Sequence, residues 1–227
     1  MEKKKVKIGF LLLGALLLAV AALVFFGWLA EEVLEGDTQQ FDAYVRTAVH
    51  QLATPELTRL MRVFSFLGSV AAIAALDLVA ICVCFYFRRT GTAVLLAITM
   101  LGAASLGVAL KHAFHRLRPV SYFGDTPSSY SFPSGHALGS LCFYGILAVI
   151  LAARVRGRVA QFGIWITAVL LIGLIGISRI YLGVHYPSDV VAGYGAGAIW
   201  VGAVGLLDRI TMDRPGKRWT PARASKQ

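Results

Sequence analysis

Three short blocks in the second half of the chain hold residues that could together transfer a phosphoryl group. The blocks are residues 111–119, 133–136 and 178–189. They supply cations to hold a phosphate, one histidine to attack it and a second histidine to protonate what leaves. Phosphoryl transfer depends mainly on positioning and on stabilisation of negative charge, so such a set needs no metal. The candidate residues are Lys111, Arg118, Ser134, Gly135, His136, Arg179, His185 and Asp189.

The first block closes a long apolar run. If the helix of that run continues to Leu117, then Lys111, His115 and Arg118 lie on one face at i, i+4 and i+7. The rise between the first and last of them is about 10.5 Å, so both long side chains could converge on one anion. Pro119 would then stop the helix. The alternative is a pair of cations that snorkel at a helix end.

The second block predicts a helix N-terminus. Ser134 lies where a capping residue would lie, and backbone N–H groups at a helix start favour an anion. Gly135 would let a phosphate approach the backbone closely, and His136 would project from the first turn. The alternative is an ordinary serine cap followed by a surface histidine.

The third block pairs a histidine with a carboxylate. His185 precedes Pro187, and Asp189 follows the histidine by four residues. A carboxylate at this spacing can bond one imidazole nitrogen and leave the other free to attack. Arg179 ends the preceding apolar run, and Gly183 supplies a turn. Alternatively, Asp189 only stabilises the first turn of a helix.

The composition indicates an integral membrane protein. Hydrophobic residues make up 57% of the chain and charged residues 15%, whereas soluble domains carry about 25% charged residues. Six apolar runs approach the ~20 residues that cross a bilayer as a helix. We therefore predict an all-α fold, a six-transmembrane-helix bundle within a membrane domain over 1–208, followed by a short basic tail over 209–227. The predicted spans are residues 8–29, 66–87, 92–112, 136–153, 159–181 and 188–207.

The net charge of +10 follows this topology and does not indicate a nucleic-acid partner. If the N-terminus lies inside, 15 of the 22 Lys and Arg residues lie in segments on that same side. The positive-inside rule then places both termini in the cytoplasm. All three blocks consequently fall on the extracytoplasmic side of the cell membrane.

The first outer connection carries two helical stripes of apolar side chains. The stripes predict two short amphipathic helices lying on the outer leaflet. They could form a lid or a wall at which lipids enter, or they could simply pack against the bundle. Their members are Phe41, Tyr44, Val45, Ala48, Val49 and Leu52, and then Leu57, Leu60, Met61 and Phe64.

The ordered set of blocks resembles the type-2 phosphatidic acid phosphatase superfamily of lipid phosphate phosphatases. The family pattern is K-x6-R-P, then P-S-G-H, then S-R-x5-H-x3-D, and this chain matches all three parts. The resemblance covers roughly residues 8–208. It implies that His185 is the nucleophile, that Asp189 orients it and that His136 protonates the leaving group. It further implies a phosphate-binding role for Lys111, Arg118, Ser134, Gly135 and Arg179.

The resemblance implies a metal-independent phosphatase without cofactors. Expected substrates are a polyprenyl diphosphate, phosphatidylglycerol phosphate, phosphatidic acid or diacylglycerol diphosphate, held in the lipid bilayer. No protein partner can be inferred. Two alternatives remain: a lipid phosphotransferase with the same nucleophile, and a transporter that only binds lipids or anions. Intact catalytic positions and the lack of an evident inverted repeat count against the transporter.

Overall fold

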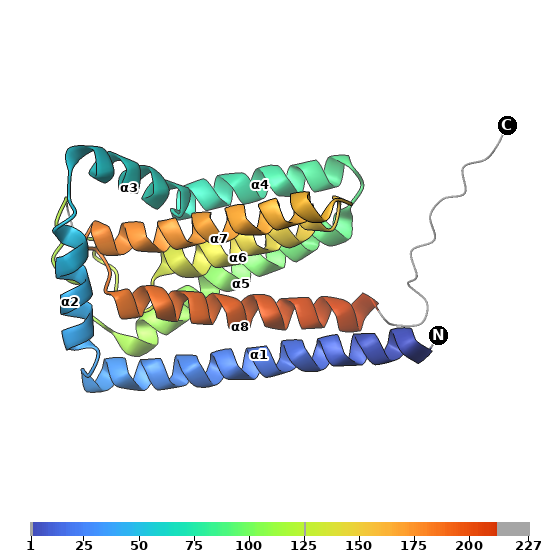
Figure 1. Ribbon diagram of the computed structural model, residues 1–227, viewed down its shortest axis with the longest axis horizontal. Coiled ribbons are helices and arrows are strands. Elements are labelled where there is room, and N and C mark those ends of the chain that lie inside the picture. The colour runs from blue at the N-terminus through green and yellow to red at the C-terminus, as the bar shows by residue number, and fades with distance from the viewer. Residues whose placement is uncertain (1, 125, 213–227) are drawn as a thin grey trace.

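A computed structural model describes residues 2–124 and 126–212, and these residues form helices and connections without strands. Long helices run side by side along the molecule, and two short ones lie at one end (Figure 1). The central α6 packs against α5, α7 and α8, and α1 packs along α8. The helices are α1 (Glu2–Glu35), α2 (Gln39–His50), α3 (Pro55–Leu67), α4 (Val70–Tyr86), α5 (Thr90–Phe114), α6 (Gly135–Ala152), α7 (Arg158–Tyr181) and α8 (Pro187–Met212).

Within residues 2–124 and 126–212, four helices are long and apolar enough to cross a membrane. They are α5, α6, α7 and the Pro187–Asp208 part of α8. The pair α3 and α4, bent by 50° at the break between them, makes a fifth candidate among the described residues. The predicted all-α membrane architecture is therefore confirmed, and α5 to α8 each begin within a few residues of the predicted spans.

The second predicted span, 66–87, contains a break that hydropathy did not reveal. Leu67 ends α3, and Ser69 starts α4 by accepting a hydrogen bond from the backbone N–H of Ala72. The apolar run continues across this break because the side chains on both sides remain hydrophobic. At the other end of the chain, α8 extends to Met212, and most of the predicted basic tail, residues 213–227, lies outside the described residues.

The expected continuation of the third span to Leu117 is wrong. Helix α5 ends at Phe114, and His115 has a left-handed backbone with φ of 47°. The chain leaves the helix there, so Arg118 does not share a helical face with Lys111. Because the chain leaves the helix, Arg116 can bind Asp189 and Arg118 can bind His185. A continued helix would hold these two side chains in other directions.

The two stretches predicted to form short amphipathic helices are helical, as α2 and α3, but they pack differently, and their place on the outer leaflet stays a prediction. Helix α2 crosses one end of the bundle (Figure 1), and its Phe41 and Tyr44 side chains are exposed, as is Leu52 just beyond its end. The predicted apolar stripe of α2 thus faces mainly outward. Helix α3 instead buries Met61 in a cluster with Tyr181 of α7.

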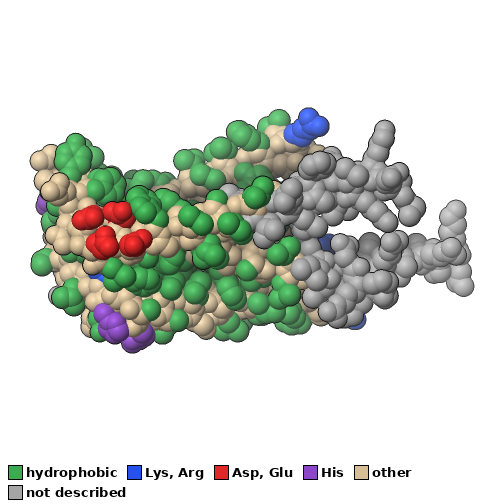
Figure 2. Space-filling view, turned by 90° about the horizontal axis from the view of Figure 1, so that it is seen from below, with side chains coloured by type: hydrophobic (Ala, Val, Ile, Leu, Met, Phe, Trp, Pro, Cys, Tyr) green, Lys and Arg blue, Asp and Glu red, His purple; other side chains and the backbone are tan. Residues whose placement is uncertain are grey.

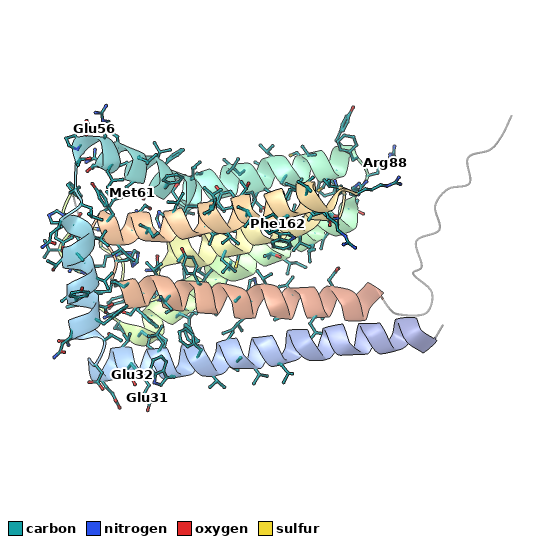
Figure 3. The ribbon with its side chains drawn as sticks, in the orientation of Figure 1. Glu31, Glu32, Glu56, Met61, Arg88 and Phe162 are labelled. Carbon is teal, nitrogen blue, oxygen red and sulfur yellow. The ribbon has the colours of Figure 1, made fainter. Side chains whose placement is uncertain are left out.

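The surface of the bundle separates apolar flanks from charged ends. Hydrophobic side chains cover much of the flank seen in Figure 2, and acidic side chains gather near one end. In Figure 3, Glu31 and Glu32 lie at the end of α1 next to α2, Glu56 lies at the start of α3, and Arg88 lies at the opposite end of the bundle. An apolar flank between polar ends is the arrangement expected of a membrane-spanning bundle.

Close helix packing brings two of the three sequence blocks together. An added Cβ at Gly193 would lie 2.6 Å from the carbonyl oxygen of Ser134. Only glycine therefore lets α8 approach the start of α6 this closely. The backbone N–H of Ser134 also donates to the carbonyl oxygen of Asp189 over 2.9 Å, which ties the second block to the third.

Candidate active site

His185 lies in the connection between α7 and α8 and is almost completely buried. Its Nδ1 lies 3.3 Å from Oδ2 of Asp189, and its Nε2 lies 2.9 Å from Nη1 of Arg118. A guanidinium can only donate, so Nε2 must accept and Nδ1 carries the proton. The unprotonated nitrogen is therefore the one that faces away from Asp189.

Burial sets the charge state of this imidazole. Desolvation lowers the pKa of His185 to about 4, although the hydrogen bond and the charge of Asp189 act to raise it. Arg118 and Arg179 add repulsion against an imidazolium. At neutral pH the ring is consequently neutral, as a nucleophile must be.

Local backbone structure holds this pair in place. Gly183 turns the chain with φ of +75°, and α8 then begins at Pro187. Oδ2 of Asp189 accepts from the backbone N–H of Tyr186 over 2.9 Å and from the hydroxyl of Ser131. The spacing of four residues thus brings histidine and carboxylate together as predicted.

Arg118 is held beside the nucleophile by the loop before α6. Its Nε donates to the carbonyl oxygen of Ser129 over 2.7 Å, and Nη2 donates to the Ser129 hydroxyl over 3.0 Å. Its Nη1 donates to the carbonyl oxygen of Val184 over 2.8 Å as well as to His185. Four of the five N–H groups are thus engaged, and one of them covers the Nε2 lone pair.

The start of α6 forms the predicted capped N-terminus. The hydroxyl of Ser134 accepts from the backbone N–H of Ala137 over 3.5 Å. Gly135 is exposed, and no atom lies within 4 Å of an added Cβ there, so the backbone can be approached. His136 follows in the first turn, half-buried, within electrostatic reach of His185.

Arg179 and Lys111 complete the cationic side of the site. Arg179 is buried, and its Nη1 donates to the hydroxyl of Ser65 on α3. Its Nε is buried and has no hydrogen-bond partner among the described residues. The Nζ of Lys111 donates to the carbonyl oxygen of Tyr130. Arg118 and Arg179 both repel Lys111. An anion bound between these cations would relieve that repulsion and supply an acceptor for the unpaired N–H of Arg179.

The structure brings all eight predicted residues to one end of the bundle. They come from α5, the following loop, α6, α7 and the start of α8. His115, which shared a face with Lys111 in the sequence prediction, is exposed, and its ring meets that of Tyr130 at 4.7 Å between centroids.

Several polar residues of the site were not predicted from the sequence. Ser129 and Ser131 lie in the irregular loop before α6, where no periodicity indicates which side chains turn inward. Arg116 lies in the first block but outside its pattern. Asp42 lies on the buried face of α2. Its position among the apolar residues of that predicted helix was the one feature of the sequence that could have indicated a buried polar contact.

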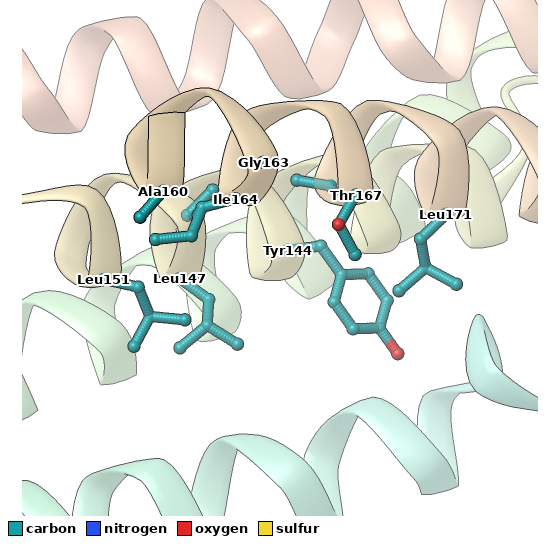
Figure 4. A pocket seen from close by; sticks show the side chains of 10 residues that line it. Tyr144, Leu147, Leu151, Ala160, Gly163, Ile164, Thr167 and Leu171 are labelled. Carbon is teal, nitrogen blue, oxygen red and sulfur yellow. The ribbon is translucent and has the colours of Figure 1, made fainter. Parts of the chain in front are cut away.

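A separate groove lies between α6 and α7, toward the other end of the bundle (Figure 4). Its lining is apolar apart from Tyr144 and Thr167. The hydroxyl of Tyr144 donates to the carbonyl oxygen of Leu67 over 2.9 Å. None of the candidate catalytic residues lines this groove, so it is distinct from the cationic site.

Comparison with known proteins identifies the family of this chain. The family model of the PAP2 superfamily matches residues 91–209. Phosphatidylglycerophosphatase B of Bacillus subtilis (strain 168) is 29% identical over 181 residues, which cover 79% of this chain and 89% of the relative. An undecaprenyl-diphosphatase of Sulfolobus acidocaldarius is 33% identical over 122 residues, covering 51% of this chain and 54% of that protein.

Two solved structures share the architecture. The crystal structure of a transmembrane PAP2-type phosphatidylglycerolphosphate phosphatase from Bacillus subtilis aligns with a TM-score of 0.80 at 27% identity, over 87% of this chain and 98% of that one. Aquifex aeolicus LpxE aligns with a TM-score of 0.54 at 24% identity, which shows a common fold. The resemblance predicted from the three blocks is confirmed: this chain belongs to the PAP2 superfamily and is a multi-pass membrane lipid phosphatase of the PAP2 type.

Proposed function

We propose that this chain hydrolyses a phosphate or diphosphate monoester of a membrane lipid through a phosphohistidine at His185. The observation that carries the proposal is the state of the His185 ring. Its Nδ1 faces Asp189, and its unprotonated Nε2 faces Arg118 on the cationic side of the site. A neutral, oriented imidazole beside fixed cations is the arrangement that attack on a phosphate requires.

In the first step, the Nε2 lone pair attacks phosphorus and the bond from phosphorus to the leaving oxygen breaks. His136, which takes up a proton when the phosphate dianion binds beside it, donates that proton to the leaving oxygen. Asp189 accepts a hydrogen bond from Nδ1 and so stabilises the positive charge that develops on the ring. In the second step, His136 takes a proton from water, the water oxygen attacks phosphorus and the bond from phosphorus to Nε2 breaks. Inorganic phosphate leaves, and both histidines return to their starting states.

The remaining candidate residues bind the phosphate oxygens in this proposal. Lys111, Arg118 and Arg179 offset the negative charge, and Gly135 presents its backbone N–H at the start of α6. Ser134 caps that helix start, and its hydroxyl binds a phosphate oxygen there. Arg118 must move its Nη1 from Nε2 of His185 to a phosphate oxygen, so substrate binding itself uncovers the nucleophile.

We further propose six spans, with α1 as the first and α4, which covers most of the predicted residues 66–87 and follows α3 at the 50° bend, as the second. The site then lies on the extracytoplasmic side, and both termini lie in the cytoplasm. Helix α2, which exposes Phe41 and Tyr44 beside polar side chains, lies on the outer leaflet beside the site. Residues 1–208 form the membrane domain, and 209–227 form a short basic cytoplasmic tail.

The substrate class follows from the names of the relatives. One is a phosphatidylglycerophosphatase and another an undecaprenyl-diphosphatase. We therefore expect a lipid whose terminal phosphate reaches the outer surface: phosphatidylglycerol phosphate, a polyprenyl diphosphate, phosphatidic acid or diacylglycerol diphosphate. In each of them the group transferred is a terminal phosphate, which is what the cationic site fits.

The test is release of inorganic phosphate from each of these four lipids by the detergent-solubilised protein in EDTA. Wild type is compared with His185→Gln, which preserves side-chain bulk, and with His112→Ala, which removes an exposed histidine at the same end of the bundle. We expect release by wild type and His112→Ala, and a loss of at least about 1,000-fold in His185→Gln.

Three outcomes would contradict the proposal. EDTA-sensitive release would indicate a metal-dependent reaction. Release that persists in His185→Gln would place the nucleophile elsewhere. Transfer of phosphate to a second lipid without free phosphate would identify a phosphotransferase. Thermal unfolding of each variant, followed in the same detergent, shows whether a loss of activity reflects a loss of fold.

A further inference from the structure

A buried ionic network joins α2 to the carboxylate that orients the nucleophile. Nη1 of Arg116 donates to Oδ1 of Asp189 over 2.7 Å. Nη2 of the same guanidinium donates to Oδ2 of Asp42 over 2.8 Å. The exposed fractions of the side chains are 14% for Arg116, 1% for Asp42 and zero for Asp189, so these charges are largely removed from solvent.

Asp42 also holds the first turn of α8. Its Oδ1 accepts from the backbone N–H of Ser188 over 2.9 Å, and its Oδ2 accepts from the Ser188 hydroxyl over 2.6 Å. The Ser188 hydroxyl in turn accepts from Nη1 of Arg116 over 2.8 Å. The guanidinium further lies over the ring of Tyr186, 4.2 Å from its centroid. Asp42 thus binds the start of α8, which carries Asp189, both directly through Ser188 and indirectly through Arg116.

In this network the two oxygens of Asp189 bind different partners. Oδ1 binds Arg116, and Oδ2 faces Nδ1 of His185. A carboxylate with one oxygen fixed by a guanidinium cannot rotate freely, so the other oxygen stays directed at the imidazole. A buried carboxylate that lost this partner would either turn away or take up a proton, and in both cases it would orient the ring less well.

We propose that Arg116 and Asp42 are positioning residues for His185, acting through Asp189 and through the start of α8. The inference rests on the proposed function, because it assigns the pair to the nucleophile of that reaction. Neither residue touches the phosphate. Helix α2 is thereby part of the catalytic apparatus and not only a cover over the end of the bundle.

The competing explanation is that the network only fastens α2 to the bundle. The two explanations differ in what the variants do to His185. If the network only attaches α2 to the bundle, the variants should have a lower melting temperature. The molecules that remain folded should then keep the wild-type kcat and the wild-type His185 titration. Positioning predicts a slower chemical step, with substrate affinity nearly preserved because the phosphate-binding cations stay in place.

The kinetic test uses Arg116→Gln, Arg116→Lys and Asp42→Asn. The matched control is Arg59→Gln, which breaks the exposed Arg59–Glu56 ion pair at 3.2 Å on α3. We expect kcat to fall on the order of 10- to 100-fold in Arg116→Gln and in Asp42→Asn while KM stays within about twofold. Arg116→Lys retains the charge without the two-pronged geometry and should recover part of kcat. The control should match wild type.

A second readout does not depend on turnover. The imidazole nitrogens of His185 can be followed by NMR in protein labelled at histidine, with the His185 resonances identified by their absence in His185→Gln. The charged and titratable groups that act on His185 are Asp189 of α8, Arg118 of the loop before α6, Arg179 of α7 and His136 of α6. In Arg116→Gln, Asp189 turns away from Nδ1 or takes up a proton, so its hydrogen bond and charge no longer raise the His185 pKa. The Nδ1 resonance should therefore shift, and the midpoint of the His185 titration should move downward from about 4.

Unchanged kcat in folded Arg116→Gln and Asp42→Asn would overturn the inference. An unchanged His185 titration together with a lowered melting temperature would also overturn the inference, because a network that only attaches α2 to the bundle gives that result. Should wild type release no phosphate from any lipid, the proposed function fails, while the NMR titration still decides whether the network positions His185.

Discussion

At the scale of single residues, the chemistry depends on which nitrogen of His185 is free. Asp189 binds Nδ1, and the Arg118 guanidinium can only donate to Nε2, so the tautomer is defined by its two neighbours. Burial then keeps the ring neutral. In the proposed reaction these two effects make Nε2 a nucleophile without requiring a separate base.

The low pKa of His185 leads to a prediction about pH. The folded-state pKa of about 4 lies below the ordinary value near 6.5, so the neutral nucleophile should persist to pH 5.5. The unfolded chain binds a proton at this ring below about pH 6.5, which the folded chain resists. The free energy of unfolding should therefore fall as pH drops from 6.5 toward 4, by at most about 1.4 kcal/mol per pH unit from this group.

The measurement is the NMR titration of His185 in wild type, combined with urea unfolding at pH 7.0 and 5.0. A midpoint at or above 6.5 would contradict the structure's account of a buried, neutral ring. Unfolding in His185→Gln serves as the control, because that variant should lose the part of the pH dependence that belongs to this residue.

The sequence predicted much at this scale, and its failures have a common cause. The spacing of His185 and Asp189, and the position of Ser134 before an apolar run, each describe contacts within one helical turn. The contacts of Arg116 with Asp42 and of Arg118 with Ser129 join segments without a shared periodicity. A single sequence does not indicate which distant segment an arginine side chain such as Arg116 or Arg118 will contact.

At the scale of elements, the site is built from helix ends. Helix α5 stops at Phe114, α6 starts at Gly135, and α8 starts two residues after His185. Hydropathy predicted these boundaries to within a few residues because an apolar run ends where the helix leaves the membrane. It failed at the break between α3 and α4, where Gly68 and Ser69 interrupt the helix but not the apolar character.

The turn at Gly183 gives the prediction for this scale. An added Cβ would lie 2.8 Å from the backbone nitrogen of Tyr122, and the φ of +75° disfavours any side chain. Gly183→Ala should therefore displace His185, two residues further on, and lower kcat on the order of 10- to 100-fold.

The matched control is Gly145→Ala on α6, where no atom lies within 4 Å of the added Cβ. This variant should keep wild-type activity and at least wild-type stability, since alanine favours a helix. Full activity in Gly183→Ala would show that the turn does not set the position of the nucleophile.

At the scale of the whole molecule, the bundle has two unlike ends. The candidate site, α2 and the start of α3 lie at one end, and Arg88 lies at the other with the connection between α4 and α5 (Figure 3). The distribution of Lys and Arg along the sequence predicted that the second end is cytoplasmic.

The proposed orientation can be tested with single cysteines at Glu56 and Arg88, one at each end, in a background without Cys82, Cys84 and Cys142. A membrane-impermeant maleimide applied to intact cells should label Glu56→Cys, and it should label Arg88→Cys only after permeabilisation. The reverse pattern would place the candidate site in the cytoplasm and would contradict the proposed outer-leaflet reaction.

The central claim is a phosphoryl group on His185, and it can be trapped directly. Wild type would be mixed with a lipid carrying a labelled terminal phosphate and quenched in alkali, in which phosphohistidine survives. His136→Asn should slow both the appearance and the loss of label, because His136 protonates the leaving oxygen and then activates water. Alkali-stable, acid-labile label on the peptide that contains His185, absent from His185→Gln, is the predicted result. Phosphate release with no label on the protein, or label that persists in His185→Gln, would contradict the account.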